Sequence, residues 1–339
     1  MTNTVHALAA TERGGLLKPF TYELSTLPDD YVEIQVENCG MCHSDLSMLN
    51  NDWGSSNYPF VPGHEVVGKV IKTGSAVKGL QVGQRVGVGW ASESCQHCRE
   101  CLAGKQNLCQ NDKSLIGDSF GGFADRVRCQ WQWAIPLVDG IDPIKAGPLF
   151  CGGITVFTPI VAYDVKPTDR VGVIGIGGLG HLAVQFLNKW GCEVTAFSSS
   201  ESKRAEAVSM GAHNFVSSEN ANALKNCASS LDYIVVTVNV PLDWEAYLSC
   251  LRPGGKLIFV GAVPVPISIA AFSLIGGQKS VGGSVIGSPA TMQTMLEFCA
   301  RHKIAPITEV FKMSEANKAF DHLRANKARY RIVLENDLA

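Results

Sequence analysis

The sequence has 339 residues, of which 18% are charged and 46% hydrophobic, and its formal net charge is −2. This length predicts two domains, and the balanced charge gives no electrostatic basis for binding nucleic acid or an anionic membrane. The N-terminus lacks a basic segment followed by an apolar core, and no stretch approaches the roughly 20 apolar residues of a transmembrane helix. We therefore expect a cytoplasmic protein.

The first part of the chain predicts a compact antiparallel β domain. Its apolar stretches are short and end at or next to glycines. In the first stretch apolar and polar residues alternate, and the others are short apolar segments. This pattern is typical of strongly curved antiparallel sheets. These stretches cover residues 31–40, 64–74, 81–90 and 121–129.

From about residue 170 the pattern changes to alternating strands and helices. An apolar strand ends in the glycine-rich turn 175–180, and the helix that follows has apolar residues at helical spacing and Gly191 as a natural C-cap. This alternation predicts a parallel sheet with helices on both faces. Further strands and helices are expected at 193–198, 201–211, 232–238, 242–251, 255–261, 290–304, 314–327 and 330–335.

Four cysteines lie close together in the stretch CQHCRECLAGKQNLC. Cys95, Cys98, Cys101 and Cys109 have the spacing C-x2-C-x2-C-x7-C, and four thiolates at such spacing can surround one ion tetrahedrally. A closed shell of four sulfurs is typical of structural zinc, and an iron–sulfur cluster, which uses similar spacing, is the alternative. Because a closed site has no open position for a substrate, we expect the chemistry elsewhere.

Three further candidate ligands are far apart in the sequence. If Cys42, His64 and Cys151 meet in the fold, two thiolates and one imidazole can hold zinc and leave its fourth position free, which is the catalytic pattern. Taken one by one, the histidine would more often be an ordinary polar residue and the two cysteines buried thiols. Glu65 is next to the histidine as a candidate additional ligand, and Asp45 could orient the imidazole through a hydrogen bond.

The turn Gly175–Gly180 reads GIGGLG and fits the dinucleotide-binding pattern G-x-G-x-x-G. It follows an apolar strand and opens a helix, so its backbone can approach a pyrophosphate at the positive end of that helix. We therefore expect cofactor contacts from Gly175, Gly177, Gly178, Leu179 and Gly180.

The next strand runs into VTAFSSSESKR and has no acidic residue at its end. Ser198 lies 18 residues after Gly180, close to the offset of roughly 20 residues at which an acid would bind the ribose of NAD. The hydroxyls of Ser198 and Ser199 can donate to a 2′-phosphate, and Lys203 can add a charge-assisted hydrogen bond. We therefore hypothesise NADP(H) as the cofactor. The alternative, a serine-rich helix start with a solvated lysine, is compatible with either cofactor.

These motifs together resemble the zinc-dependent medium-chain alcohol dehydrogenases, and within them the NADP-dependent branch similar to cinnamyl alcohol dehydrogenase. The resemblance covers the whole chain and implies an α/β fold with two domains: a GroES-like β-barrel catalytic domain of residues 1–152 and 287–339, and a Rossmann doubly wound parallel sheet of residues 153–286, with the active site between them. It rests on Cys42-His43-Ser44-Asp45, Pro62-Gly63-His64-Glu65, the four-cysteine stretch, Cys151-Gly152-Gly153-Ile154-Thr155 and Gly175–Gly180.

The resemblance also implies roles for single residues and two zinc ions per chain, one structural and one catalytic. Ser44 would accept the proton of the alcohol, and His43 would face the cofactor pyrophosphate. Many relatives carry a histidine three residues after the proton-accepting hydroxyl, and here that position is Ser47, which leaves the end of the proton relay open. The catalytic zinc would be held by Cys42, His64 and Cys151, with Glu65 beside them. The other cofactor contacts would come from Thr155, Val260, Ala262 and Arg331.

The implied activity is hydride transfer between NADP(H) and primary alcohols or aldehydes. Trp53 and Trp90 fall where related enzymes line the substrate channel, which would favour aromatic or unbranched substrates, although a role in the core is nearly as compatible with both. The alternatives are a polyol or secondary-alcohol dehydrogenase of the same superfamily and, in a different class, a zinc-ribbon protein that binds nucleic acid. Residues 280–286 resemble the family's dimer edge, so we expect a homodimer with a small-molecule substrate and no nucleic-acid or membrane partner.

Overall fold

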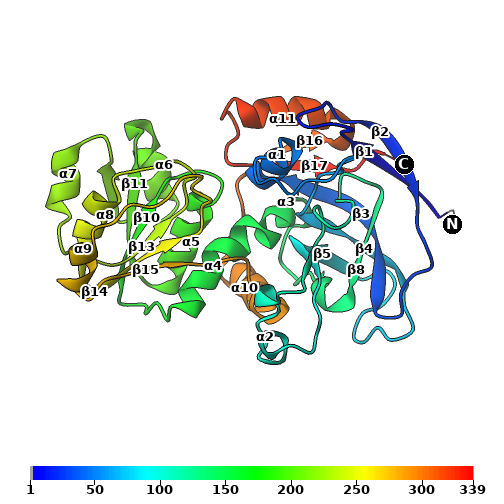
Figure 1. Ribbon diagram of the computed structural model, residues 1–339, viewed down its shortest axis with the longest axis horizontal. Helices are drawn as coiled ribbons and strands as arrows, with labels where there is room; N and C mark the ends of the chain where they lie inside the picture. Colours follow the sequence, from blue (N-terminus) through cyan, green and yellow to red (C-terminus); the bar gives the residue numbers. More distant parts are fainter. Residues whose placement is uncertain (1–2, 339) are drawn as a thin grey trace. The chain divides into compact units, whose positions relative to one another are not determined.

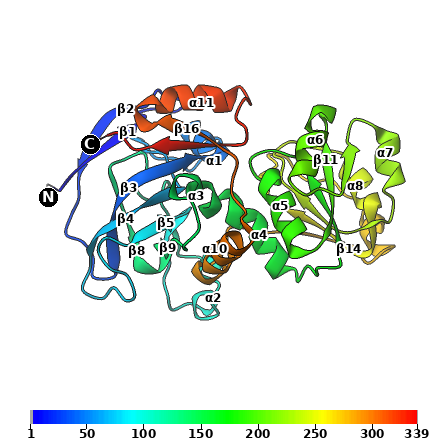
Figure 2. The same cartoon turned by 180° about the vertical axis from the view of Figure 1, so that it is seen from behind.

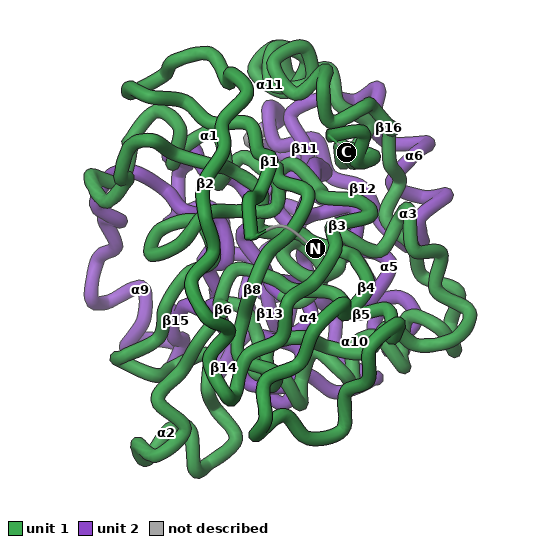
Figure 3. Tube along the Cα trace, turned by 90° about the vertical axis from the view of Figure 1, so that its right-hand side faces the viewer, with its two compact units in different colours: residues 1–154, 286–339 green, residues 155–285 purple. Residues whose placement is uncertain are grey.

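The structure, a computed structural model, describes residues 3–338. The chain divides into two compact units: unit 1 comprises residues 1–154 and 286–339, and unit 2 comprises residues 155–285 (Figure 3). The predicted domain boundaries differ from these by two residues at the first junction and by one residue at the second. Unit 2 is therefore an insertion into unit 1.

Unit 1 is built on a seven-stranded sheet, counted over the described residues, with strand order β16-β17-β3-β4-β5-β9 and β8 paired to β3 (Figure 1). Neighbouring strands are antiparallel except β16 and β17, which are parallel. Val32, Ile34 and Val36 alternate along β3 and lie in one hydrophobic core. The strands are β3 (Tyr31–Met41), β4 (Val66–Thr73), β5 (Arg85–Val88), β8 (Arg126–Gln130), β9 (Ile135–Pro136), β16 (Thr308–Lys312) and β17 (Arg331–Glu335).

In the described residues, two small antiparallel sheets and several helices complete unit 1. The longest of these helices, α10, starts at Pro289 after the N-cap Ser288, whose hydroxyl accepts a hydrogen bond from the Thr291 amide. Its buried residues Met292, Met295, Leu296 and Cys299 recur at helical spacing. The sheets pair β1 (Thr4–Ala9) with β2 (Lys18–Glu23) and β6 (Ala91–Glu93) with β7 (Lys113–Ser114), and the helices are α1 (His43–Leu49), α2 (Arg99–Leu102), α3 (Pro143–Ala146), α10 (Pro289–His302) and α11 (Ala316–Arg324).

Unit 2 contains a parallel sheet of six strands, counted over the described residues, in the order β12-β11-β10-β13-β14-β15. The order is 3-2-1-4-5-6 by position in the chain, which is that of the Rossmann fold. The parallel sheet predicted from the alternation of strands and helices is therefore confirmed. Its strands are β10 (Arg170–Ile174), β11 (Glu193–Ser198), β12 (Asn214–Ser217), β13 (Leu231–Val236), β14 (Leu251–Phe259) and β15 (Ser280–Gly283).

Helices cover both faces of this sheet. Ile174, Ile234 and Val236 pack in one cluster with Trp244 and Leu248 of α8. The alternate residues of the same strands face the other side, where α5 contacts β10 and β11. In Figures 1 and 2 the helices α5 and α8 lie on opposite sides of the strands. The helices of this region are α4 (Gly152–Ala162), which crosses the boundary between the units, α5 (Gly180–Trp190), α6 (Arg204–Ser209), α7 (Ala221–Asn226), α8 (Trp244–Cys250) and α9 (Ala271–Ile275).

Within the described part of the chain, no helix by itself has the length and apolar character needed to cross a membrane, whereas the bent pair Pro143–Phe150 and Gly152–Ala162 meets the criteria of length and composition when taken together.

Candidate active site and metal centres

Three segments that are far apart in the sequence meet at a buried cluster in unit 1. Cys42 is the N-cap of α1 directly after β3, His64 precedes β4, and Cys151 ends a short 3₁₀ helix before α4. The sulfurs of Cys42 and Cys151 are 3.9 Å apart, and His64 Nε2 is 3.2 Å from the Cys151 sulfur. A carboxylate oxygen of Glu65 lies within 4.8 Å of these three ligand atoms. The structure thus brings together the four residues proposed for the catalytic metal.

The geometry of this cluster fits zinc. With Zn–S bonds of about 2.3 Å, two sulfurs of a tetrahedral site lie about 3.8 Å apart, and the observed separation of Cys42 and Cys151 is 3.9 Å. Thiolate and imidazole are ligands that zinc favours. The buried Glu65 Oε2 atom has no hydrogen-bond partner in the protein, so it is available as an additional ligand. Two cysteines and one histidine leave a position for an exchangeable group, as catalytic zinc requires.

One buried carboxylate orients two of the ligands. Asp45 Oδ1 accepts hydrogen bonds from His64 Nδ1 at 2.9 Å and from the Gly63 amide at 2.8 Å, and Oδ2 accepts from the Cys42 amide at 2.9 Å. Because Nδ1 is engaged, Nε2 is the atom that faces the sulfurs. Burial disfavours the charged imidazolium, but the charge and hydrogen bond of Asp45 outweigh it and raise the pKa of His64 above its usual value. Because a metal binds the neutral imidazole, protons and metal compete for this ring.

A buried ion pair lies against the cluster. Arg331 Nη2 donates to Glu65 Oε1, and Arg331 Nη1 is 3.8 Å from the Cys42 sulfur. Burial raises the pKa of Glu65 to about 7, although the charge of Arg331 opposes the rise. Gly40 makes room for this carboxylate, because a Cβ atom there would lie 1.9 Å from Glu65 Oε2. Arg331, which the family resemblance assigns to the cofactor phosphates, is thus placed beside the metal ligands, a contact that the sequence did not predict.

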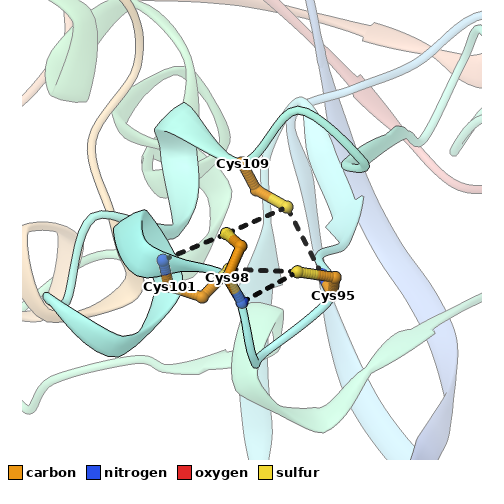
Figure 4. A group of neighbouring side chains, drawn as sticks. All are labelled: Cys95, Cys98, Cys101 and Cys109. Atoms are coloured by element: carbon orange, nitrogen blue, oxygen red, sulfur yellow. Dashed lines mark hydrogen bonds between the residues drawn. The ribbon is translucent and has the colours of Figure 1, made fainter.

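The four cysteines of the stretch 95–109 form a second cluster. The Cys95 and Cys101 sulfurs are 3.9 Å apart and the Cys98 and Cys109 sulfurs 4.0 Å, near the tetrahedral separation for zinc (Figure 4). Hydrogen bonds from the backbone amides of His97 and Cys98 lower the pKa of Cys95 to about 6. All four ligand positions come from the protein, so this cluster can hold a metal but offers no place for a substrate.

Helix α1 carries the residues proposed for proton transfer. The Ser44 hydroxyl donates to the Cys42 sulfur at 3.7 Å, so it lies beside one of the candidate metal ligands. Ser47 is three residues further along α1 and therefore lies on the same helical face. His43 is exposed. Proton transfer by Ser44 stays a prediction, and the end of the proton relay stays open.

Trp90 and Trp53 form a row of rings that begins at the His64 imidazole. The Trp90 ring is edge-on to the imidazole with centroids 5.3 Å apart, and the Trp53 ring is edge-on to Trp90 at 6.0 Å. Trp53 is 45% exposed, so it is not a core residue. Trp90, by contrast, is partly buried and packs against the hydrophobic core of unit 1, so contact of the two rings with a substrate stays a prediction.

The turn after β10 has the geometry of a phosphate-binding loop. Gly175 has a φ of 89°, and a Cβ atom there would lie 2.4 Å from Val238. A Cβ on Gly180 would lie 1.8 Å from the Gly175 carbonyl oxygen, whereas one on Gly177 would meet nothing within 4 Å. Two glycines therefore permit the tight turn, and the third leaves its outer side open to a phosphate at the start of α5.

The end of β11 carries no acidic side chain. Ser198 is its last residue, and its hydroxyl accepts a hydrogen bond from the Ser200 amide at 3.2 Å. The neighbouring Ser199 is exposed. Lys203 Nζ donates to the Ile176 carbonyl at 2.6 Å, which places its charge at the glycine-rich turn. The two serines and the lysine are thus gathered where the adenosine end of a dinucleotide would lie in this fold.

The remaining residues proposed for the cofactor are also described. Gly178 precedes Leu179, which is the N-cap of α5. Thr155 is buried in α4, and Val260 and Ala262 follow the carboxyl end of β14. Ligands of doubly wound sheets bind outside the carboxyl ends of the strands. The contacts of these residues with a cofactor stay predictions.

The fold and the two sites define a class of protein. A parallel sheet of Rossmann order with a glycine-rich turn before its first crossover helix binds dinucleotides. A buried Cys-His-Cys set with a free position, carried by a separate β unit, is a catalytic zinc centre. The combination is that of a zinc-binding dehydrogenase.

Comparison with known proteins gives the family. Residues 28–139 match the model of the alcohol dehydrogenase GroES-like domain, and residues 178–301 match that of the zinc-binding dehydrogenases. The chain is 52% identical to the aldehyde reductase AdhA of Synechocystis sp. over 98% of its own length and 99% of that protein. It is 39% identical to a probable cinnamyl alcohol dehydrogenase of Populus deltoides over 96% and 94% of the two chains. The chain belongs to the zinc-dependent medium-chain alcohol dehydrogenases, in the branch of the cinnamyl alcohol dehydrogenases.

Solved structures agree with this assignment. A cinnamyl alcohol dehydrogenase of Sorghum bicolor superposes with a TM-score of 0.94 at 36% identity, covering 98% of this chain and 97% of the other. The cinnamyl alcohol dehydrogenase of Helicobacter pylori, solved with NADP(H), gives a TM-score of 0.91 at 29% identity, covering 99% of both chains. The predicted α/β class, a GroES-like domain with a Rossmann sheet, is confirmed.

Proposed function

We propose that this alcohol dehydrogenase works mainly as an NADPH-dependent aldehyde reductase for aromatic or unbranched aldehydes, and oxidises the corresponding primary alcohols in reverse. The observation that carries the cofactor assignment is the end of β11, where Ser198, Ser199 and Lys203 take the place of an acid. A carboxylate at that place would repel the 2′-phosphate of NADP, whereas hydroxyls and an ammonium group can bind it.

Glu201, the acidic residue close to these serines, is compatible with the assignment of NADP as the cofactor. Glu201 is paired with Arg204, and the Arg204 guanidinium also lies over the Phe215 ring, 4.6 Å from its centroid. The negative charge of Glu201 is therefore partly neutralised by Arg204. The Lys203 amine, by contrast, reaches the glycine-rich turn. The relative from Helicobacter pylori, which was solved with NADP(H), supports the same choice.

The choice of cofactor is tested by Ser198→Asp. We expect the wild type to have a higher kcat/KM with NADPH than with NADH, and the variant to lose that preference by roughly tenfold to a thousandfold. The reason is that one like-charge contact at 4 Å costs about 1 kcal/mol in water and about 4 kcal/mol at an effective dielectric of 20. The measurement is steady-state kinetics with both reduced cofactors.

Ser202→Asp is the matched control for this experiment. It adds the same charge to the same segment at an exposed serine that follows the turn. We expect it to change the preference by less than the Ser198 variant does, because surface charges are screened over about 8 Å at physiological salt. Equal use of both cofactors by the wild type, or an unchanged preference in Ser198→Asp, would contradict the assignment.

The chain's own residues prepare the site for hydride transfer. When bound, zinc polarises the substrate oxygen and NADPH supplies the hydride. The two cysteines and His64, fixed by Asp45, hold the metal position and keep one side free for the substrate. Ser44, beside Cys42, can give a proton to the oxygen that becomes the alcohol.

The substrate preference rests on the row of Trp53 and Trp90. We expect benzaldehyde-like and unbranched aldehydes to have a higher kcat/KM than branched ketones, because flat or narrow substrates can lie along the rings. Trp53→Ala should raise KM for an aromatic aldehyde by about three- to tenfold, with a smaller change for a short unbranched aldehyde, since an aromatic contact contributes about 0.5–1.5 kcal/mol beyond its area. A preference for branched ketones would favour a secondary-alcohol or polyol dehydrogenase instead.

We further propose two zinc ions per chain and a cytoplasmic homodimer. Both cysteine clusters have sulfur separations that suit zinc, and thiolate ligands persist in a reducing compartment. The edge strand β15 pairs with β14 on one side, and in the described residues no strand of this chain covers its other side. Metal analysis should give near two zinc ions per chain, where one would fit a zinc ribbon. Sedimentation equilibrium should give twice the mass of the chain.

A further inference from the structure

A fully buried histidine holds one carbonyl of the glycine-rich turn. His181, in the first turn of α5, is 0% exposed, and its Nδ1 atom is 3.0 Å from the Gly177 carbonyl oxygen. The backbone amide of His181 donates to the same oxygen at 3.1 Å. Because a carbonyl oxygen can only accept, Nδ1 carries the proton of this bond. The Gly177 oxygen is thus held by two donors of one residue.

This contact fixes the direction of the next amide. In a planar trans peptide the carbonyl of one residue and the N–H of the next point in opposite directions. Because the Gly177 carbonyl is held towards α5, the Gly178 N–H points away from α5. The turn is open at this point, because a Cβ atom on Gly177 would meet nothing within 4 Å. Backbone N–H groups at the start of a helix are the donors that bind the phosphates of dinucleotides.

We propose that His181 is a positioning residue for the dinucleotide: its ring locks the Gly177–Gly178 peptide so that the Gly178 N–H faces the cofactor pyrophosphate. The imidazole does not touch the cofactor and acts through the backbone. The inference rests on the proposed dinucleotide function but not on the choice of NADP, because the pyrophosphate is common to NADPH and NADH.

Two substitutions separate the hydrogen bond from the packing of the ring. His181→Leu keeps an apolar side chain of similar size and removes the donor, whereas in His181→Asn the side-chain amide nitrogen takes the place of Nδ1. We expect His181→Leu to raise the Kd of NADPH, measured by fluorescence titration, by about three- to tenfold, which corresponds to one ordinary hydrogen bond. We expect His181→Asn to stay within about twofold of the wild type.

Gln185→Leu is the matched control on the same helix. Gln185 Nε2 donates to the carbonyl oxygen of His181, four residues earlier, at 3.1 Å. Like the bond of His181, this is a hydrogen bond from a side chain to the backbone carbonyl four residues earlier, but it lies one helical turn further from the glycine-rich turn. Loss of the Gln185 bond should leave the Kd of NADPH unchanged. Adenosine 2′-phosphate, which has no pyrophosphate, should bind equally well to the wild type and to His181→Leu.

NADH distinguishes this inference from the cofactor assignment. His181→Leu should raise the Kd of NADH by the same factor as that of NADPH, whereas Ser198→Asp should raise the Kd of NADPH and leave that of NADH unchanged or lower, because an acid there can bind the ribose. The inference is overturned if His181→Leu binds NADPH as the wild type does, if His181→Asn is no better than His181→Leu, or if Gln185→Leu weakens binding equally. If the leucine variant does not fold, His181→Gln replaces it: its amide nitrogen is one bond further out, so it should bind NADPH more weakly than His181→Asn.

Discussion

Replacing Cys151 by serine is expected to lower kcat/KM for aldehyde reduction by at least about a thousandfold while the protein stays folded. The Cys151 sulfur lies 3.9 Å from that of Cys42 and 3.2 Å from His64 Nε2, so it completes the ligand set. A serine hydroxyl is not ionised at neutral pH and is a poor zinc ligand. Loss of Lewis-acid assistance removes several kcal/mol of transition-state stabilisation, and each 1.36 kcal/mol is about tenfold in rate.

Three measurements check this result: steady-state kinetics, zinc content and thermal unfolding. We expect zinc to fall by about one ion per chain and Tm to change little, because a metal site with a free position contributes less to folding than a closed one. Cys192→Ser is the control, since this buried thiol belongs to neither cluster and its sulfur already lies 3.4 Å from the Lys166 carbonyl, which a hydroxyl can also bond. If Cys151→Ser kept wild-type turnover, the assignment of the catalytic ligands would be wrong.

Replacing Cys101 by serine is expected to destabilise the protein. Cys101 is buried and its sulfur is 3.9 Å from that of Cys95 in the closed cluster. Zinc binding to a closed site is coupled to folding, so losing one of four thiolates removes part of the folding free energy. We expect a loss of about 3 kcal/mol or more, and a Tm lower by roughly 4 °C or more.

The segment around this cluster is hydrogen-bonded to the rest of unit 1. Loss of the metal site should therefore destabilise unit 1 as well as the segment. The Ser94 hydroxyl accepts a hydrogen bond from Trp133 Nε1 at 3.1 Å, and Asn107 donates to the Ile286 carbonyl at 2.7 Å. Leu102→Ser is the control, because this next residue of α2 is 75% exposed. An equal loss of Tm in both variants, or an unchanged Tm in Cys101→Ser with one zinc ion retained per chain, would contradict a structural role for the metal.

The catalytic ligands could be named from the sequence but not brought together by it. Cys95 to Cys109 are close in the chain, so their spacing alone limits them to a shared ion. Cys42, His64 and Cys151 depend on β3, β4 and the 3₁₀ helix before α4, and their meeting is a result of how the sheet of unit 1 folds. In the sequence, only the family resemblance connects them.

Contacts between distant segments were the part that sequence reasoning missed. Arg331 is 266 residues from Glu65 in the chain, and nothing local to either residue indicates that they form a buried ion pair. The signal that could have pointed to it is an arginine at the start of an apolar strand, because a buried charge requires a partner. The contact of His181 is local instead: a histidine four residues after a glycine of the turn can reach back to that glycine's carbonyl, although the helical pattern alone does not indicate it.

The sequence by itself determined the features that depend on neighbours along the chain. These are the parallel sheet from the alternation of strands and helices, the turn of GIGGLG, the four-cysteine cluster and the absence of an acid after β11. The tertiary structure alone decided which side chains share the buried space around His64: Asp45 behind the ring, Trp90 on its edge and the Arg331–Glu65 pair beside the sulfurs. The physical reason is that local patterns are fixed by backbone periodicity and turn geometry, whereas these contacts follow from the packing of strands that are paired across hundreds of residues.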